Sequence, residues 1–158
     1  MKILVPVDGS EPSLDAVRHA LHLRRGGLQA SFVLVTVQEP SYTYEMMLAP
    51  DAGVLEKLSG AVGGRALKDA ETLFEAAGVP FQREIASGDP AQALLEIAVR
   101  YGCEAIIMGA RGRGALRIAL LGSVSHAVLQ ASAVPVTIVK HVANQRGRGC
   151  TISPAPAS

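Results

Sequence analysis

A stretch of glycine and serine residues in the last third of the chain has a spacing that suits the binding of an anion. Gly109 and Gly112 stand at one end of it, and Gly122 and Ser123 at the other, just before a helical pattern. Glycines accept positive φ angles and let backbone N–H groups approach an anion closely. The first N–H groups of a helix lack partners within it, and the helix dipole favours negative charge. We therefore expect both ends to close on one phosphate chain, with hydrogen bonds from the hydroxyls of Ser123 and Ser125.

This stretch matches neither of two common nucleotide-binding motifs. No Gly-Lys-Ser/Thr follows the glycines, so it is not a P-loop. A Rossmann fingerprint follows the first strand and opens its helix at once, whereas residues 110–121 separate Gly109 from the helix here. Backbone donors suit any phosphate, so the glycines alone do not distinguish ATP from AMP.

Hydrophobic patterning predicts five strands that alternate with four helices. The apolar runs at 3–7, 31–37, 81–86, 105–108 and 134–139 are expected to form strands. Helical spacing follows at 11–25, 54–77, 90–101 and 124–131. Ser10 and Asp89 are predicted N-caps, because each is followed by a proline in the first helical turn. Such alternation predicts an α/β fold with a mainly parallel sheet covered on both faces.

In an open parallel sheet, ligands bind where the strand order reverses, at the carboxyl ends of the strands. With the common strand order 3-2-1-4-5, Asp8, Val37 and Gly109 would share one crevice. Asp8 has a second interpretation, as the start of an Asx turn that caps the first helix. Pro6 either shapes this crevice or marks the place where strand pairing stops.

Composition and charge exclude several classes of function. The 158 residues suit one domain, and the net charge of +1 gives no electrostatic footprint for nucleic acid or an anionic membrane. No apolar run is long enough to span a bilayer, and the chain starts without the pattern of a signal peptide. Cys103 is expected to be a buried or half-buried thiol, and it forms no CxxC pair with Cys150. We expect a cytoplasmic protein.

The organisation of the chain follows from the same patterns. Residues 1–142 are predicted to form a single α/β domain, and the polar residues 143–158 a disordered tail. The connection at 39–53 is long for a compact domain, so it is either functional or mobile.

The full motif resembles that of a known family. Gly109-x2-Gly112-x9-Gly122-Ser123 is similar to the nucleotide motif of the universal stress protein family, and the resemblance extends to about residue 140. The segment Val5–Ser10 resembles the first strand and turn of that family. The segment Leu34–Pro40 resembles its second strand, although Thr36 stands where a histidine is often found. Val134-Pro135-Val136 resembles its closing strand.

The resemblance implies a flavodoxin-like or Rossmann-like fold that binds ATP or AMP, with Mg²⁺ or Mn²⁺ as a companion of the phosphates. Asp8 would lie near the adenine and ribose, and Val37 would contact adenine through its backbone. Met108 and Gly109 would lie by the ribose, and the phosphates would be held around the later glycines. Arg111 is either a phosphate ligand or a solvated loop residue. The predicted site comprises Pro6, Val7, Asp8, Val37, Met108, Gly109, Arg111, Gly112, Gly122, Ser123, Val124 and Ser125.

The resemblance also implies a homodimer that pairs through strand Val134–Val139, acting as a sensor or regulator in stress tolerance. Two alternatives stay open: a slow ATPase, and a dimeric interaction protein in which the nucleotide is incidental. The sequence favours the regulator over the ATPase, because it offers no evident general base and no Walker lysine.

Overall fold

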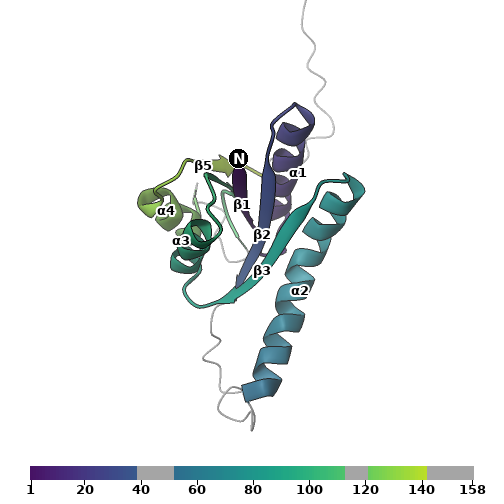
Figure 1. The fold of residues 1–158 in the computed structure, drawn as a ribbon. Coiled ribbons are helices and arrows are strands. Elements are labelled where there is room, and N and C mark those ends of the chain that lie inside the picture. The colour runs from purple at the N-terminus through teal and green to yellow at the C-terminus, as the bar shows by residue number, and fades with distance from the viewer. Residues whose placement is uncertain (39–51, 113–120, 142–158) are drawn as a thin grey trace, which may run out of the picture.

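A computed structural model of the chain describes residues 1–38, 52–112 and 121–141 (Figure 1). All five strands are parallel and form one sheet in the order β3-β2-β1-β4-β5. The predicted flavodoxin-like fold and strand order are therefore confirmed. The segment 39–51 and the tail 143–158 lie outside the described residues.

The observed elements agree with the predicted ones to within a few residues. The strands are β1 (Lys2–Pro6), β2 (Ser31–Gln38), β3 (Phe81–Ser87), β4 (Ala105–Gly109) and β5 (Val136–Val139). The helices are α1 (Glu11–Arg25), α2 (Ala52–Ala76), α3 (Pro90–Arg100) and α4 (Ser123–Ala131). None of the helices in the described ranges is both long and apolar enough to cross a membrane.

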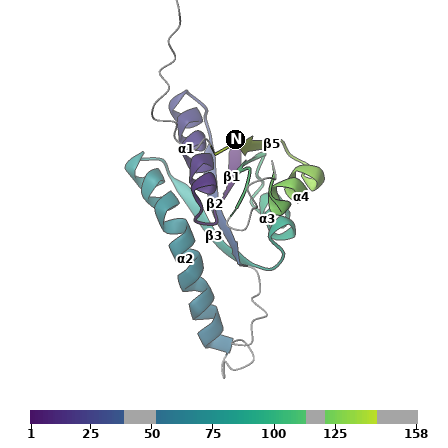
Figure 2. The ribbon, with the colours of Figure 1, turned by 180° about the vertical axis from the view of Figure 1, so that it is seen from behind.

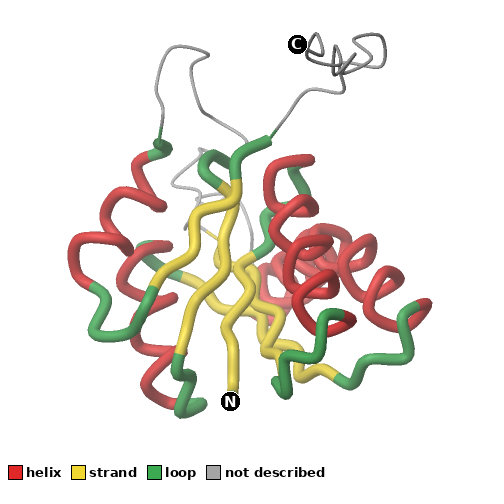
Figure 3. The backbone as a smooth tube through the Cα atoms, turned by 90° about the horizontal axis from the view of Figure 1, so that it is seen from above, coloured by secondary structure: helices red, strands yellow, loops and turns green. Residues whose placement is uncertain are grey.

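The sheet lies between two layers of helices, with α1 and α2 on one face and α3 and α4 on the other (Figures 1, 2 and 3). Neighbouring residues of β1 enter opposite layers: Ile3 packs with the α1–α2 side, whereas Leu4 packs with the α3–α4 side. A strand buried on both faces must be apolar at every position, which explains the continuous apolar runs. Cys103 is buried in the α3–α4 layer as predicted, and burial raises the pKa of its thiol.

Both predicted N-caps are confirmed. The Ser10 side chain accepts a hydrogen bond from the Ser13 backbone N–H at 3.4 Å. The Asp89 carboxylate accepts one from the Gln92 N–H at 2.9 Å. Because each cap fixes where its helix begins, the two turns that follow β1 and β3 are also fixed.

The last strand begins two residues later than predicted. The Val134 N–H donates to the Ser132 hydroxyl at 3.2 Å rather than to a strand, and Pro135 has no N–H to donate. The first contact with β4 is the hydrogen bond from the Ile106 N–H to the Pro135 carbonyl, at 2.9 Å. Regular pairing therefore starts only at Val136.

Candidate functional site

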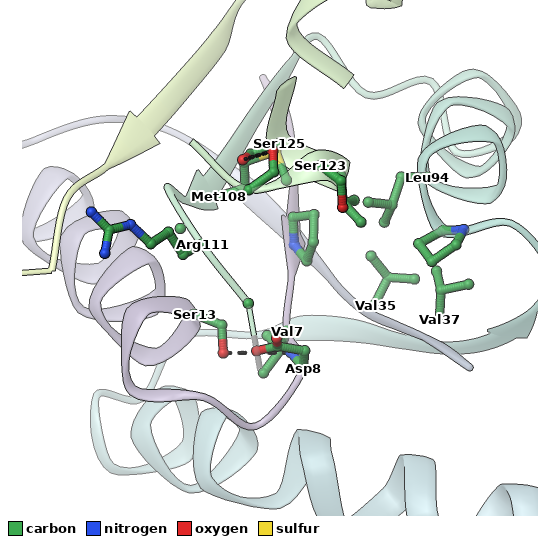
Figure 4. Close-up of a pocket in the computed structure, with 16 residues that line it drawn as sticks. Val7, Asp8, Ser13, Val35, Val37, Leu94, Met108, Arg111, Ser123 and Ser125 are labelled. Atoms are coloured by element: carbon green, nitrogen blue, oxygen red, sulfur yellow. Dashed lines mark hydrogen bonds between the residues drawn. The ribbon is translucent and has the colours of Figure 1, made fainter. Parts of the chain in front are cut away.

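A pocket of about 580 Å³ opens at the carboxyl ends of β1, β2 and β4 (Figure 4). Its size falls within the range of small-molecule sites. Every residue of the predicted site lines this pocket: Pro6, Val7, Asp8, Val37, Met108, Gly109, Arg111, Gly112, Gly122, Ser123, Val124 and Ser125. Sequence reasoning missed four further lining residues: Ser13, Val35, Pro90 and Leu94. The predicted crevice at the point where the strand order reverses is therefore present.

One wall of the pocket is a network of hydrogen bonds around Asp8. Its Oδ1 atom accepts hydrogen bonds from the Ser10 backbone N–H at 3.0 Å and from the Ser10 hydroxyl at 2.5 Å. The Asp8 N–H donates to the Ser13 hydroxyl oxygen at 3.4 Å (Figure 4). This hydroxyl in turn donates to the Ser10 carbonyl at 2.8 Å. The predicted Asx turn therefore forms, but Ser10 rather than Asp8 caps the helix. The turn holds the carboxylate in the pocket lining.

At two of the glycines a Cβ atom would fit only if a neighbouring group shifted. A Cβ atom on Gly109 would stand 2.6 Å from the carbonyl oxygen of Pro12 in α1. One on Gly112 would stand 2.5 Å from the Oδ2 atom of Asp8. None of Gly109, Gly112 and Gly122 has a positive φ angle, so a left-handed backbone conformation does not explain these glycines. Gly109 and Gly112 leave space for the Pro12 carbonyl and the Asp8 carboxylate, respectively.

The other end of the pocket is the N-terminus of α4. The N-cap is Gly122, a residue that has no side chain to cap the helix. The Gly122 N–H donates to the Ala110 carbonyl at 2.8 Å, which ties the two ends of the glycine stretch together. The first N–H of α4 with a described backbone acceptor is that of His126, which donates to the Gly122 carbonyl at 3.0 Å. The N–H groups of the residues before it are therefore positioned to meet an anion.

The two serines of α4 differ in what their hydroxyls do. The Ser123 side chain is exposed. Ser125 is 3% exposed, and its hydroxyl donates to the Ala110 carbonyl at 2.8 Å and to the Gly122 carbonyl at 3.0 Å. The expected hydrogen bond from the Ser125 hydroxyl to a phosphate thus competes with contacts inside the protein.

Another part of the pocket lining is apolar. Val35, Leu94 and Met108 contribute side chains to this wall (Figure 4). The last rung between β1 and β2 is the hydrogen bond from the Val7 N–H to the Val35 carbonyl at 2.7 Å. Because backbone groups alternate along a strand, the N–H and C=O of Val37 point to the same side as those of Val35. β1 ends at Pro6, and no further hydrogen bond to this segment is described at Val37, which lines the pocket.

Among the described lining residues, only Asp8 and Arg111 carry charge. In Figure 4 the guanidinium group of Arg111 extends away from the side chains of Val35 and Ser123. Its role as a phosphate ligand stays a prediction.

Comparison with known proteins identifies the family of the chain. The model of the universal stress protein family matches residues 1–140. This chain belongs to the universal stress protein family. Universal stress protein YxiE of Bacillus subtilis is 33% identical over 146 residues, which cover 88% of this chain and 98% of the relative.

Solved structures of universal stress proteins have the same fold. The structure of MJ0577 from Methanocaldococcus jannaschii has a TM-score of 0.76 at 26% identity, and the match covers 90% of this chain and 97% of that one. A universal stress protein in complex with cAMP has a TM-score of 0.64 at 28% identity, with 88% of this chain and 96% of that chain covered. The family resemblance inferred from the glycine motif is therefore confirmed.

Proposed function

We propose that this universal stress protein binds an adenine nucleotide, ATP or AMP, in the pocket between β1, β2 and β4. The observation that carries the proposal is the convergence of the predicted site. Residues from β1, β2, β4, the glycine stretch and α4, far apart in sequence, line one pocket of suitable size. The relative that was solved with cAMP supports a nucleotide as the ligand class.

The backbone of Val37 supports adenine as the base. A neighbouring N–H donor and C=O acceptor match the Watson–Crick edge of adenine, where N1 accepts a hydrogen bond and the N6 amino group donates one. Guanine offers the opposite roles, with O6 as the acceptor and N1–H as the donor. Both guanine groups would face a backbone group of the same kind, which leaves buried polar groups unpaired. ATP and AMP are therefore expected to bind in preference to GTP and GMP.

The N-terminus of α4 supports the position of the phosphates. Its N-cap lacks a capping side chain, and the N–H groups of Ser123 and Val124 belong to the first turn beside the pocket. Such a terminus attracts anions through its free donors and its dipole. Mg²⁺ or Mn²⁺ would be held mainly by phosphate oxygens, because the described residues contain no group of three metal-ligating side chains. Asp8 is the carboxylate among the described lining residues.

A homodimeric regulator is the form in which we expect the protein to act. Strand β5 lies at one edge of the sheet, so one side of its backbone has no strand neighbour among the described residues. Edge strands of this kind are ready to pair with another chain. A second copy that pairs along Val136–Val139 would join two sheets and leave both pockets open to nucleotide.

The decisive experiment identifies the small molecules that copurify with the protein and measures which nucleotides it binds. The purified chain is denatured, and released small molecules are identified by mass spectrometry; calorimetry then measures the binding of AMP, ATP and GTP. Adenine nucleotide in the released fraction, or selective binding of AMP or ATP, supports the proposal. Absence of released adenine nucleotide together with no measurable binding of ATP or AMP would overturn it.

A matched pair of glycine variants distinguishes an effect on nucleotide binding from an effect on folding. A Cβ atom on Gly122 would stand 3.4 Å from the Cα atom of Arg111, and one on Gly26, at the end of α1, would stand 3.4 Å from the Leu23 carbonyl. Gly122→Val and Gly26→Val therefore introduce similar crowding at two different places. We expect only Gly122→Val to abolish nucleotide binding, with both variants still folded by circular dichroism.

A further inference from the structure

The Ser125 hydroxyl links the start of α4 to Ala110, the residue that follows β4. Its hydroxyl proton is shared between the carbonyl oxygens of Ala110, at 2.8 Å, and Gly122, at 3.0 Å. The Gly122 N–H donates to the same Ala110 oxygen at 2.8 Å. Two donors from the start of α4 thus converge on one acceptor at the end of β4.

That acceptor is itself fixed. Ala110 is 5% exposed, and its N–H donates to the Val139 carbonyl of β5 at 2.8 Å. The peptide groups around Ala110 are therefore anchored to the sheet, and the start of α4 is anchored to Ala110. The orientation of the first turn of α4 relative to the pocket depends on this anchor.

The direction of the Ser125 hydroxyl has a second consequence. A serine at the third position of a helix commonly competes for backbone groups near the cap. Here it acts as a donor to carbonyl oxygens, so the N–H groups of the first turn keep their capacity to bind a ligand. To donate to a phosphate, the hydroxyl would have to leave two carbonyl acceptors in a site that is 3% exposed.

We infer that Ser125 is a positioning residue for the phosphate end of the pocket rather than a ligand of the phosphate. It holds Gly122 and the N–H groups of Ser123 and Val124 at a fixed place relative to β4. This inference rests on the proposed function, and it reassigns one residue of the predicted site.

The test compares ligands that share a base and differ in phosphate. Calorimetry measures the affinities of adenosine, AMP and ATP for the wild type, Ser125→Ala and Ser125→Thr. Loss of one positioning hydrogen bond is expected to weaken AMP and ATP binding about five- to tenfold. Adenosine binding should be unchanged, and Ser125→Thr, which keeps the hydroxyl, should restore AMP binding. A variant that merely destabilised the fold would weaken all three ligands alike.

A second measurement needs no ligand. Amide hydrogen exchange at Gly122 in the ligand-free protein should be faster in Ser125→Ala than in the wild type, because the start of α4 loses one of the two hydrogen bonds that anchor it to Ala110 and opens more readily. Ser132→Ala is the matched control. Ser132 lies at the other end of the same helix, and its hydroxyl donates to the Val134 carbonyl at 2.8 Å. This control should change neither the exchange at Gly122 nor the affinity for AMP.

The outcomes separate the hypotheses. Equal losses for adenosine and AMP, or no loss for either, overturn the positioning role. A loss confined to AMP and ATP with unchanged exchange at Gly122 also overturns it, in favour of direct contact with the phosphate. A wild type that binds none of the three ligands refutes the proposed function itself, whereas a wild type that binds AMP no better than Ser125→Ala refutes only the role of Ser125.

Discussion

The carboxylate of Asp8 lies so close to Gly112 in the pocket lining that a Cβ atom on Gly112 would stand 2.5 Å from Asp8 Oδ2. The other oxygen of this carboxylate is held by the backbone and side chain of Ser10. The carboxylate therefore cannot swing away from residue 112 without breaking two hydrogen bonds. This contact joins the turn after β1 to the glycine stretch after β4, the two segments between which the nucleotide is proposed to bind.

The first prediction concerns this contact. Gly112→Ala should weaken AMP binding about tenfold, because the new methyl group displaces either Asp8 or the glycine stretch, and each hydrogen bond to a charged group contributes about 1.5–3 kcal/mol. Calorimetry measures the affinity, and urea unfolding checks that the fold persists. In an Asp8→Ala background, the same change should cost little, because the clashing oxygen is gone. Equal effects in the two backgrounds would show that the contact plays no part.

The second prediction concerns Gly109, whose role is in packing as well as in the pocket. The Pro12 carbonyl that its Cβ atom would meet at 2.6 Å belongs to the backbone of α1, which cannot move aside like a flexible side chain. Gly109→Ala should therefore lower the free energy of unfolding by about 1–3 kcal/mol, the usual cost of overpacking. Urea denaturation measures this. Gly26→Ala, where the nearest atom stands at 3.4 Å, is the control and should cost clearly less.

Much of the fold was predictable because many of its elements depend only on residues that are close together in sequence. Strand β1 needs apolar side chains on both faces, as Ile3 and Leu4 show, and such a run has few alternatives in a chain of alternating strands and helices. The caps at Ser10 and Asp89 were predictable for a similar reason, since a cap depends only on its own turn. The spacing of the glycines identified the pocket because both ends of that stretch lie beside the carboxyl end of β4.

The features that were missed depend on contacts between distant segments. Leu94 of α3 lines the pocket together with residues of β1, β2 and β4, and this proximity is not specified by any local pattern. The late start of β5 depends on the Ser132 hydroxyl, which captures the Val134 N–H. The ring of His141, which follows β5, contacts Asp15 of α1, a residue distant in sequence. Pairings of this kind are set by the tertiary fold.

The third prediction tests whether two copies pair through β5. The N–H groups of Ile106 and Ala110 donate to the carbonyls of Pro135 and Val139. The backbone groups of alternate residues of β5 therefore point towards β4, and the backbone N–H of Val136 points towards the open edge of the sheet. Val136→Pro should therefore remove a donor to the partner chain and keep the pairing with β4. Sedimentation should find a dimer for the wild type and a folded monomer for Val136→Pro.

Thr137→Pro is the companion variant for the same strand. Its N–H faces β4, so its loss should destabilise the domain itself, which thermal unfolding measures. If the wild type sediments as a monomer at micromolar concentration, or if Val136→Pro still sediments as a dimer, pairing through β5 is refuted.

The fourth prediction concerns acid stability and the ion pair between α1 and the end of β5. The Asp15 carboxylate contacts the His141 ring at 2.5 Å and the Arg18 guanidinium at 2.7 Å. Burial raises the pKa of Asp15, but the hydrogen bonds and charges of His141 and Arg18 outweigh it, so the pKa lies below its ordinary value. A carboxyl with a lowered native pKa stabilises the fold above its unfolded pKa of about 3.9, and this contribution is lost as the pH falls through the native value.

Asp15→Asn should accordingly lower the free energy of unfolding at pH 7 by up to about 1 kcal/mol, a modest figure because the pair is partly exposed. The difference from the wild type should shrink as the pH falls below about 4, where the wild-type carboxyl also becomes protonated. Urea denaturation from pH 7 to pH 3 measures both quantities. Asp69→Asn, an exposed position on α2, serves as the control and should leave stability unchanged across this range. A difference that does not shrink between pH 4 and pH 3 would contradict the lowered pKa of Asp15.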